Sequence, residues 1–391
     1  MFVLLLLLLS FSCKKNVSVS TPEVNIDNVD VVMTNKDPEI DSSGTIITRK
    51  VSATTTVEER KMEGVPTICT GKDGKLYAAW YASNIRAGEG SGDYITLAVS
   101  LDKGLTWKNN ALLVEPKDKL DRIFDPSLWS DFKGNVHLSW SKCKGQWWDG
   151  VAGVWDALIS SESDSIAVSV PHLLINKGII MNKPTLLADG NTILYPNYIW
   201  NVNQSLVDNT GGIYIYRQNV SSAQKPTFVS RIPLPDWKVL VAEPQILQLN
   251  GDTLATYIRT PTGIFSTTSF NGGMSWTPST QLKTIGDNPD SRFFIGRLKS
   301  NNILLVVNSA VIRTRLTAFI SVDNGKTFKY KLLLDGRDPV SYPDVTEDNE
   351  GNIYVIYDRE RTKAKEILVV KIKESDIVNN TKIPTPQKIN L

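Results

Sequence analysis

The chain has 391 residues, 41% of them hydrophobic, and its 43 basic and 41 acidic side chains leave a formal net charge of only +2. This is the composition of an ordinary folded protein, and the length suits either one large repeat-built β domain or two smaller domains. The near-neutral charge gives no electrostatic footprint for a nucleic acid or an acidic membrane surface, so we expect no nucleic-acid partner.

The first twelve residues, MFVLLLLLLSFS, form an apolar run that is too short to span a bilayer and ends in small residues before Cys13. We interpret residues 1–12 as a signal peptide. The site resembles the bacterial lipobox, which implies that Cys13 becomes the lipidated first residue of the mature protein. Lys14 after the cysteine favours an outer-membrane lipoprotein, periplasmic or surface-exposed, at the cell envelope. A cleaved ordinary secretory signal is the alternative.

Residues 13–59 are rich in Val, Thr, Ser, Asn and Asp without sustained periodicity, which is typical of a tether that includes at most one strand. From residue 60 the pattern changes. Short apolar runs such as KLYAAWYA, YITLAVS, NVHLSW, NILLVVN and NIYVIYD alternate with Gly, Asn and Asp turns. We therefore expect an all-β domain over residues 60–391.

Three segments repeat one pattern: SLDKGLTW from Ser100, SFNGGMSW from Ser269 and SVDNGKTF from Ser321. Each follows a predicted strand. Asp or Asn with the central Gly predicts a tight turn that needs positive φ, and the final aromatic residue anchors the turn on the sheet. The second and third segments begin 52 residues apart and the first two 169 apart, close to one and three blades of a β-propeller. That period divides residues 60–391 into six blades.

These repeats resemble the Asp-box, or BNR repeat, of the sialidase superfamily. The resemblance implies a six-bladed β-propeller whose active site lies at the axis, where one face gathers loops from every blade, with the boxes themselves structural and distant from it. It also implies a tyrosine nucleophile activated by a glutamate, an aspartate as acid and base, and three arginines that bind the carboxylate of the sugar.

Three segments supply candidates for these roles in the order that the resemblance implies. VAEPQILQLNGDTLATYIR contains Glu243 as the partner of the nucleophile and Arg259 as a carboxylate ligand, and DPVSYPDV contains Tyr342 as the nucleophile. IRTRLTAFIS contains Arg313 as a second carboxylate ligand, with Arg297 and Arg315 as less favoured choices.

The first blade departs from the family pattern. The first carboxylate-binding arginine is expected where this chain has Gly64, in EGVPTICTG, and it is absent. In the loop before the first box, Glu89 falls near the expected place of the acid and base, and Asp93 is next nearest. A glycine-flanked carboxyl group there could act as a general acid if burial raised its pKa.

A segment with its own character, between residues 121 and 196, resembles a branch of sialidase-like proteins common in glycan-degrading bacteria. Its polar and aromatic residues are pocket candidates: Arg122, Asp125, Trp147, Trp148, Asp149, Asn182 and Lys183. Asp125 is the rival general acid, and Lys183 or Arg122 could replace the missing positive charge. Alternatively, DPSLW and NKPT are only turns at the starts of strands.

Two cysteines remain after Cys13, and both Cys69 and Cys143 lie in strand-like apolar contexts, so we expect buried unpaired thiols. His137 and His172 are the only histidines in the sequence. They form no cluster at metal-ligand spacing, and we expect neither a metal nor another cofactor. His137 alternates within a strand, which favours a packed structural role.

The sequence thus predicts a retaining exo-sialidase that removes a terminal sialic acid or a related acidic sugar from a glycan. One alternative is a lyase or a glycosidase of another mechanism on the same propeller, which the placement of the two histidines argues against. The other is a non-catalytic glycan-binding lipoprotein. No oligomerisation signal is visible, so we expect a monomer whose only membrane contact is its lipid anchor.

Overall fold

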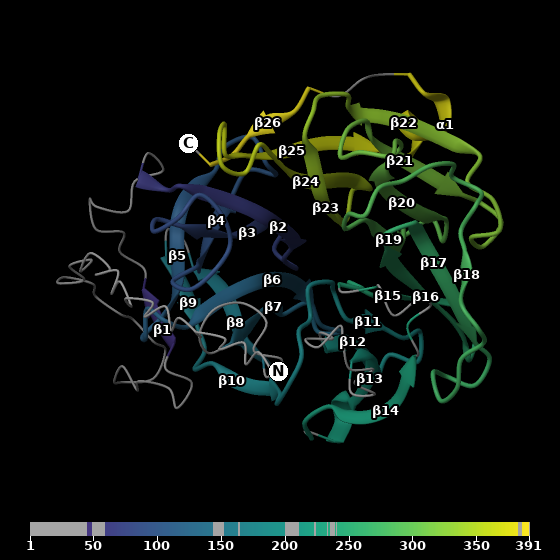
Figure 1. Cartoon of the computed structure of the whole chain (residues 1–391), viewed down its shortest axis with the longest axis horizontal. Coiled ribbons are helices and arrows are strands. Elements are labelled where there is room, and N and C mark those ends of the chain that lie inside the picture. The colour runs from purple at the N-terminus through teal and green to yellow at the C-terminus, as the bar shows by residue number, and fades with distance from the viewer. Residues whose placement is uncertain are drawn as a thin grey trace, which may run out of the picture.

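The computed structural model consists almost entirely of antiparallel β-strands, arranged as six sheets around a common centre (Figure 1). It describes residues 45–48, 59–143, 152–162, 165–199, 211–222, 224–232, 234, 239, 241–381 and 385–390. The chain forms a six-bladed β-propeller, as the strand pattern and the spacing of the boxes predicted.

Each blade is a sheet of at least four strands in which the first strand of the blade lies at one edge. Blade 1 comprises β2 (Met62–Thr70), β3 (Leu76–Ser83), β4 (Tyr94–Ser100) and β5 (Lys108–Pro116), with β1 (Thr45–Thr48) added beyond β5. Blade 2 comprises β6 (Arg122–Ser130), β7 (Val136–Cys143), β8 (Gly153–Glu162) and β10 (His172–Ile175), and β9 (Ser165–Val168) also pairs with β8. Blade 3 comprises β11 (Thr185–Leu186), β12 (Thr192–Ile199), β13 (Gly212–Asn219) and β14 (Thr227–Ile232), with a short 3-10 helix, η2 (Val220–Ser222), between the last two.

The second half of the propeller is more regular. Blade 4 comprises β15 (Gln245–Asn250), β16 (Thr253–Thr260), β17 (Gly263–Ser269) and β18 (Thr280–Gln281). Blade 5 comprises β19 (Phe294–Arg297), β20 (Ile303–Asn308), β21 (Leu316–Ser321) and β22 (Tyr330–Asp335). Blade 6 comprises β23 (Val340–Glu347), β24 (Asn352–Arg359), β25 (Glu366–Lys373) and β26 (Gln387–Lys388), with helix α1 (Glu374–Asn379) before its last strand. In the part of the chain that the structure describes, no helix is long and apolar enough to cross a membrane.

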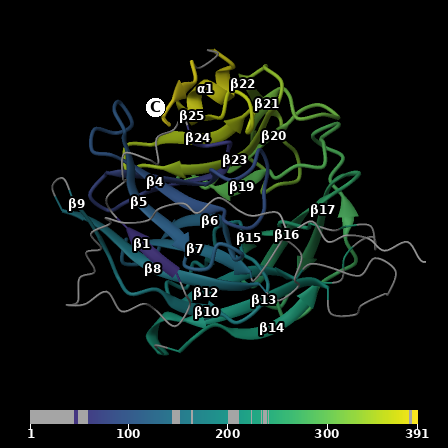
Figure 2. The same ribbon diagram turned by 60° about the vertical axis from the view of Figure 1, so that its left-hand side comes forward.

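Among the described residues no strand is shared between the last blade and the first, and hydrogen bonds to side chains of blade 6 join the two. Blade 6 lies next to blade 1 in both views (Figures 1 and 2), and β2 contacts β23 directly. Asp344 of β23 accepts hydrogen bonds from the Thr67 hydroxyl at 2.7 Å and from the Ile68 backbone N–H at 2.9 Å. Asp358 of β24 accepts one from the Val65 N–H at 2.9 Å. Because these groups are buried, each bond satisfies polar atoms that water cannot reach.

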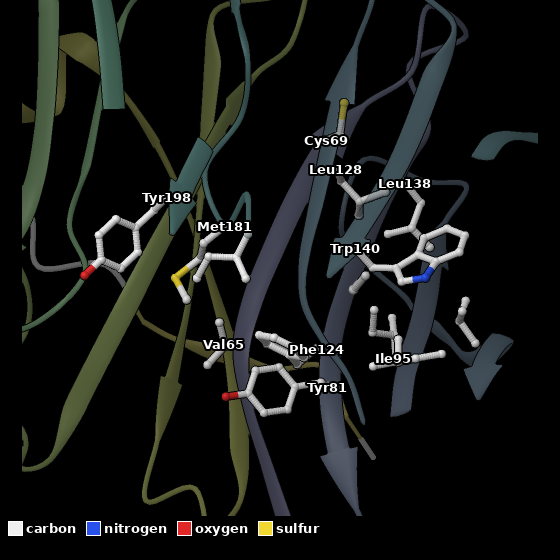
Figure 3. Close-up of a cluster of buried hydrophobic side chains, with 14 of the residues drawn as sticks. Val65, Cys69, Tyr81, Ile95, Phe124, Leu128, Leu138, Trp140, Met181 and Tyr198 are labelled. Carbon is white, nitrogen blue, oxygen red and sulfur yellow. The ribbon is translucent and has the colours of Figure 1, made fainter. Parts of the chain in front are cut away.

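The largest apolar cluster runs through blades 1 to 4 and reaches Tyr342 in blade 6. Figure 3 shows part of it, where Val65, Tyr81 and Phe124 gather. Central strands such as β3 are buried along their whole length because a neighbouring blade covers each face. Cys69 and Cys143 are buried, as predicted, and neither forms a disulfide among the described residues. Burial raises the pKa of the Cys69 thiol.

The Asp-boxes form the turns that their sequences predicted. In the first box the Ser100 hydroxyl donates to Asp102 at 2.8 Å, and Asp102 also accepts from the backbone N–H and hydroxyl of Thr106 at 2.8 and 2.6 Å. Gly104 adopts a φ of 88°, which favours glycine. The third box repeats the same bonds from Ser321. Each box joins the third and fourth strands of its blade.

Candidate active site

Four non-glycine residues with positive φ stand directly before a proline at the start of a blade. Val65, Asp125, Glu243 and Tyr342 have φ values of 56°, 50°, 40° and 58°. In blades 1, 2 and 6 the residue lies within an interruption of the strand register, which is a β-bulge. Such backbone costs on the order of 1–3 kcal/mol per residue and clusters at functional sites. Three of these four residues are catalytic candidates from the sequence.

The structure brings Tyr342, Glu243 and Arg259 into direct contact although they come from two different blades. The Tyr342 hydroxyl donates to Oε1 of Glu243 at 3.0 Å. Nη1 of Arg259 donates to the same Glu243 oxygen at 2.6 Å and to the Tyr342 oxygen at 2.7 Å. All three side chains are at least nine-tenths buried. The second carboxylate oxygen of Glu243 is buried without a hydrogen-bond partner among the described residues.

The electrostatics of Tyr342 require a base beside it. Burial raises the pKa of the Tyr342 hydroxyl to about 12, although the neighbouring Arg259 opposes this rise. A free phenolate is therefore scarce at neutral pH. Glu243, within hydrogen-bonding distance, is positioned to take the phenol proton as a new bond forms at the oxygen.

Further arginines surround the tyrosine ring. The guanidinium carbons of Arg259 and Arg313 lie 5.8 and 5.2 Å from the centre of the Tyr342 ring. Asp290 connects the two, since its carboxylate accepts from Nε of Arg259 at 2.6 Å and its backbone carbonyl accepts from Arg313 at 3.2 Å. The less favoured choices for a carboxylate ligand, Arg297 and Arg315, are not among the cations found against this ring. Arg297 instead binds backbone carbonyls of blade 4.

Asp125 and Glu89 lie in the same pocket but have opposite electrostatic character. Burial raises the pKa of Asp125 to about 8, against the opposing effect of Arg122, while Glu89 and Glu243 raise it further. Burial would also raise the pKa of Glu89, but Arg122 and Arg361 lower it below the ordinary value. Arg122 donates to Glu89 at 2.9 Å and to Asp93 at 3.1 Å. Asp125 thus carries a proton at neutral pH, whereas Glu89 is a paired carboxylate.

These groups line one pocket of about 110 Å³. Its walls combine carboxyl, guanidinium and phenol groups with apolar side chains: Tyr81, Glu89, Arg122, Phe124, Asp125, Ile179, Met181, Val241, Glu243, Arg259 and Tyr342. The pocket therefore gathers Tyr342, Glu243, Arg259, Asp125, Glu89 and Arg122 in one place.

Asn182 and Lys183 have other positions. The Asn182 side chain is buried and donates to the backbone carbonyls of Glu243 and Pro244 at 2.8 and 3.2 Å, so it holds the positive-φ backbone at Glu243. Lys183 donates to the Ile68 carbonyl and to Asp344 and lines a separate groove between blades 3, 4 and 5. The structure does not bring Lys183 to the pocket.

Several candidates from the sequence lie outside the described residues, namely Cys13, Trp147, Trp148 and Asp149. Of the histidines, His137 is hydrogen-bonded through Nδ1 to Asp156 at 2.8 Å and stacks on Trp129 with ring centres 3.9 Å apart. The described residues contain no group of three or more side chains suited to hold a metal ion.

Sequence reasoning missed Asp290, Arg292 and Arg361. Arg292 is fully buried and donates to the Asn182 side chain and to the backbone carbonyls of Pro66 and Met181, which connects blade 1 to the segment that enters blade 3. None of the three belongs to a repeated pattern. One signal was available, however: the residue before proline recurs in GVP, DPS, EPQ and YPD, and it marks the four residues with positive φ at the starts of blades.

Comparisons with known proteins agree with this architecture. Residues 59–355 match a family model described as a BNR repeat-like domain. The Hadza microbial sialidase Hz136 superposes with a TM-score of 0.68 and 16% identity, covering 82% of this chain and 67% of that one. A leech intramolecular trans-sialidase superposes with a TM-score of 0.63 and 14% identity, covering 85% of this chain and 71% of that one. A protein of unknown function from Dyadobacter fermentans superposes with a TM-score of 0.62 and 14% identity, covering 84% of this chain and 98% of that one. No curated protein matches the sequence significantly. At these identities the structural similarity establishes the fold alone.

Proposed function

Since the chain belongs to the family of BNR repeat-like domains, we propose that it is a retaining exo-glycosidase that removes a terminal sialic acid or a related acidic sugar from glycans. The observation that carries this proposal is the buried contact of Tyr342 with Glu243 and Arg259, at 3.0 and 2.7 Å. A purely structural tyrosine needs neither a buried carboxylate nor a ring of guanidinium groups around it.

A tyrosine nucleophile suits a sugar that carries a carboxylate on its anomeric carbon, because a neutral phenol is not repelled by that charge as an aspartate or glutamate would be. In the first step the Tyr342 oxygen forms a bond to the anomeric carbon while its proton passes to Glu243. The bond to the leaving oxygen breaks at the same carbon, and a general acid protonates that oxygen. Water then displaces Tyr342: the deprotonated general acid takes the proton of the attacking water, and Tyr342 recovers its own proton from Glu243. The two inversions give net retention.

Asp125 is better suited than Glu89 to be the general acid. A group with a pKa of about 8 holds its proton at neutral pH and can release it to a departing alkoxide. Glu89 instead makes ion pairs with Arg122 and Arg361 at 2.9 and 3.2 Å, which favour its charged form. We therefore assign Glu89 to the positioning of these two arginines.

The experiment that tests the proposal is hydrolysis of a fluorogenic sialoside by the purified protein. Glu243→Gln should lower kcat by about 10²–10⁴-fold, the usual contribution of a positioned base, and Tyr342→Phe by at least as much. Tyr195→Phe is the matched control, because it also removes a hydroxyl from a buried tyrosine, bonded to Gln218 at 2.6 Å in blade 3. Wild-type turnover that survives Tyr342→Phe would exclude the nucleophile, and a wild type inert on sialosides would exclude this substrate.

We further propose that Cys13 carries a lipid that attaches the enzyme to the outer membrane, on the basis of the apolar run and small residues before it. Metabolic labelling with a fatty acid should mark the wild type but not Cys13→Ser. Label on Cys13→Ser equal to that on the wild type would exclude Cys13 as the lipidated residue, and no label on either protein would leave only the ordinary secretory signal.

A further inference from the structure

Gly64 stands where the sequence lacks an expected arginine, and the structure fills the space beside it with another arginine. A Cβ atom added at Gly64 would lie 2.7 Å from Cδ, 2.8 Å from Nε and 2.9 Å from Cγ of Arg361. Side-chain atoms do not approach so closely. The glycine on β2 and the arginine beyond β24 are therefore a matched pair, and a larger residue at position 64 would displace the Arg361 side chain.

Arg361 is held in place by two carboxylates. Its Nε donates to Asp358 at 2.8 Å, and its Nη1 donates to Glu89 at 3.2 Å. Asp358 is itself fixed, since it accepts from the Val65 N–H at 2.9 Å and from the Ser341 hydroxyl at 2.6 Å. These two residues adjoin Gly64 and Tyr342 in the sequence, so Asp358 sets the position of Arg361 relative to both.

The guanidinium carbon of Arg361 lies nearer the centre of the Tyr342 ring than that of Arg259 or Arg313. The distance is 4.0 Å for Arg361, compared with 5.2 Å for Arg313 and 5.8 Å for Arg259. The Nη2 atom of Arg361 is buried and has no hydrogen-bond acceptor among the described residues. A buried donor without an acceptor is costly, and a bound anion would remove that cost.

We propose that Arg361 binds the substrate carboxylate together with Arg259 and Arg313, and so supplies from blade 6 the contact that position 64 cannot make. This inference rests on the proposed function, because it requires an acidic sugar at Tyr342. It defines the substrate class as sugars whose carboxylate adjoins the anomeric carbon, since all three guanidinium groups lie against the ring of the tyrosine that would attack that carbon, 5.8, 5.2 and 4.0 Å from its centre.

Arg361→Gln tests the contact, with Arg359→Gln as the matched control. Arg359 is a nearby arginine that pairs with Glu360 and Glu366. Loss of one charge-assisted contact should raise KM for a fluorogenic sialoside about ten- to a hundredfold. The preference for the free acid over its methyl ester should shrink by the same factor, a readout that a purely structural role would not change. The control should keep both values within twofold.

Exchange of the two residues tests the matched pair directly. Gly64→Arg alone should lose activity, because its Cβ would clash with Arg361. The double variant Gly64→Arg, Arg361→Gly removes that clash and returns a guanidinium group to the same space. It should therefore be more active than either single variant, a non-additive result that neighbouring residues produce. Circular dichroism and thermal unfolding of each variant separate this effect from misfolding.

The outcomes separate this inference from the proposed function. If the wild type cleaves the sialoside and Arg361→Gln keeps the wild-type KM and acid preference, the proposed role of Arg361 is wrong and the proposed glycosidase activity is confirmed. If the wild type does not cleave it, calorimetry with N-acetylneuraminic acid decides. Binding that Arg361→Gln weakens at least tenfold supports Arg361 without the reaction, and no binding of this acid to the wild type overturns both proposals.

Discussion

Replacing Asp125 by Asn tests the general acid of the proposed reaction. With a pKa of about 8, Asp125 is about 90% protonated at pH 7 and about 10% protonated at pH 9. The kcat of the wild type should therefore fall about tenfold between these two pH values, since only the protonated form can assist the leaving group. Asp125→Asn cannot donate this proton at any pH, so its kcat should be low and without this alkaline fall.

The choice of substrate sharpens the assay. An umbelliferyl leaving group departs with little help, whereas the sugar hydroxyl of sialyllactose needs protonation. Asp125→Asn should therefore lose about 10²–10⁴-fold in kcat on sialyllactose and clearly less on the umbelliferyl sialoside. Glu89→Gln is the control carboxyl variant, and it should affect KM more than kcat because Glu89 pairs with Arg122 and Arg361. A wild-type kcat that stays constant up to pH 9, or equal losses on both substrates, would refute the assignment.

Stability provides a second readout of the same carboxyl group, independent of activity. Below about pH 4 the folded and unfolded states both carry the Asp125 proton. Between about pH 4 and pH 8 the unfolded state loses it while the folded state keeps it, so this group lowers the free energy of unfolding as pH rises. A tenfold change in proton affinity corresponds to about 1.4 kcal/mol. Asp125→Asn should therefore become more stable than the wild type by several kcal/mol towards pH 8, as measured by urea denaturation.

Three further variants test the scaffold. Arg292→Met should lower the free energy of unfolding by about 3–5 kcal/mol in urea denaturation, because it leaves several buried partners unpaired. His137→Gln should destabilise the protein below about pH 6.5, because Asp156 stabilises the charged form of His137 and raises its pKa against the opposing effect of burial. The destabilisation should shrink as pH rises through that raised pKa. Thermal unfolding at pH 5.5 and 8.5 should therefore show a difference only at the lower pH. Asp102→Ala should lower Tm without changing kcat, because its hydrogen bonds lie within a box turn outside the pocket.

The fold was predictable because its information is local and repeated. The strand pattern from residue 60 and the boxes at Ser100, Ser269 and Ser321 depend on turns that a few neighbouring residues determine. The contact of Glu243 with Tyr342 was reached only through the resemblance, because two residues 99 positions apart carry no local signal of proximity. Local pattern thus defines the blades, and closure of the ring brings the site together.

Arg361 shows why the rest of the site could not be predicted. The sequence shows a missing arginine at Gly64, and Lys183 and Arg122 were the cations considered as replacements. The side chain that fills the space comes from the far end of the chain, and only the closure of blade 6 against blade 1 brings it there. Lys183, by contrast, is used to neutralise Asp344 between the blades. A side chain that a sequence motif lacks can thus be replaced, in the folded protein, by a residue from a distant and unrelated position in the sequence.

The four positive-φ residues before proline explain how one repeated fold can position different chemistry. Val65, Asp125, Glu243 and Tyr342 share a positive φ and a following proline, so the backbone presents one residue from the start of each of these blades. Their side chains are an apolar group, a carboxyl group, a carboxyl group and a phenol. Because the backbone is the same, the side chain alone distinguishes a packing position from a catalytic one. The apolar residue occurs in blade 1, next to Gly64, where the side chain of Arg361 approaches from blade 6 instead.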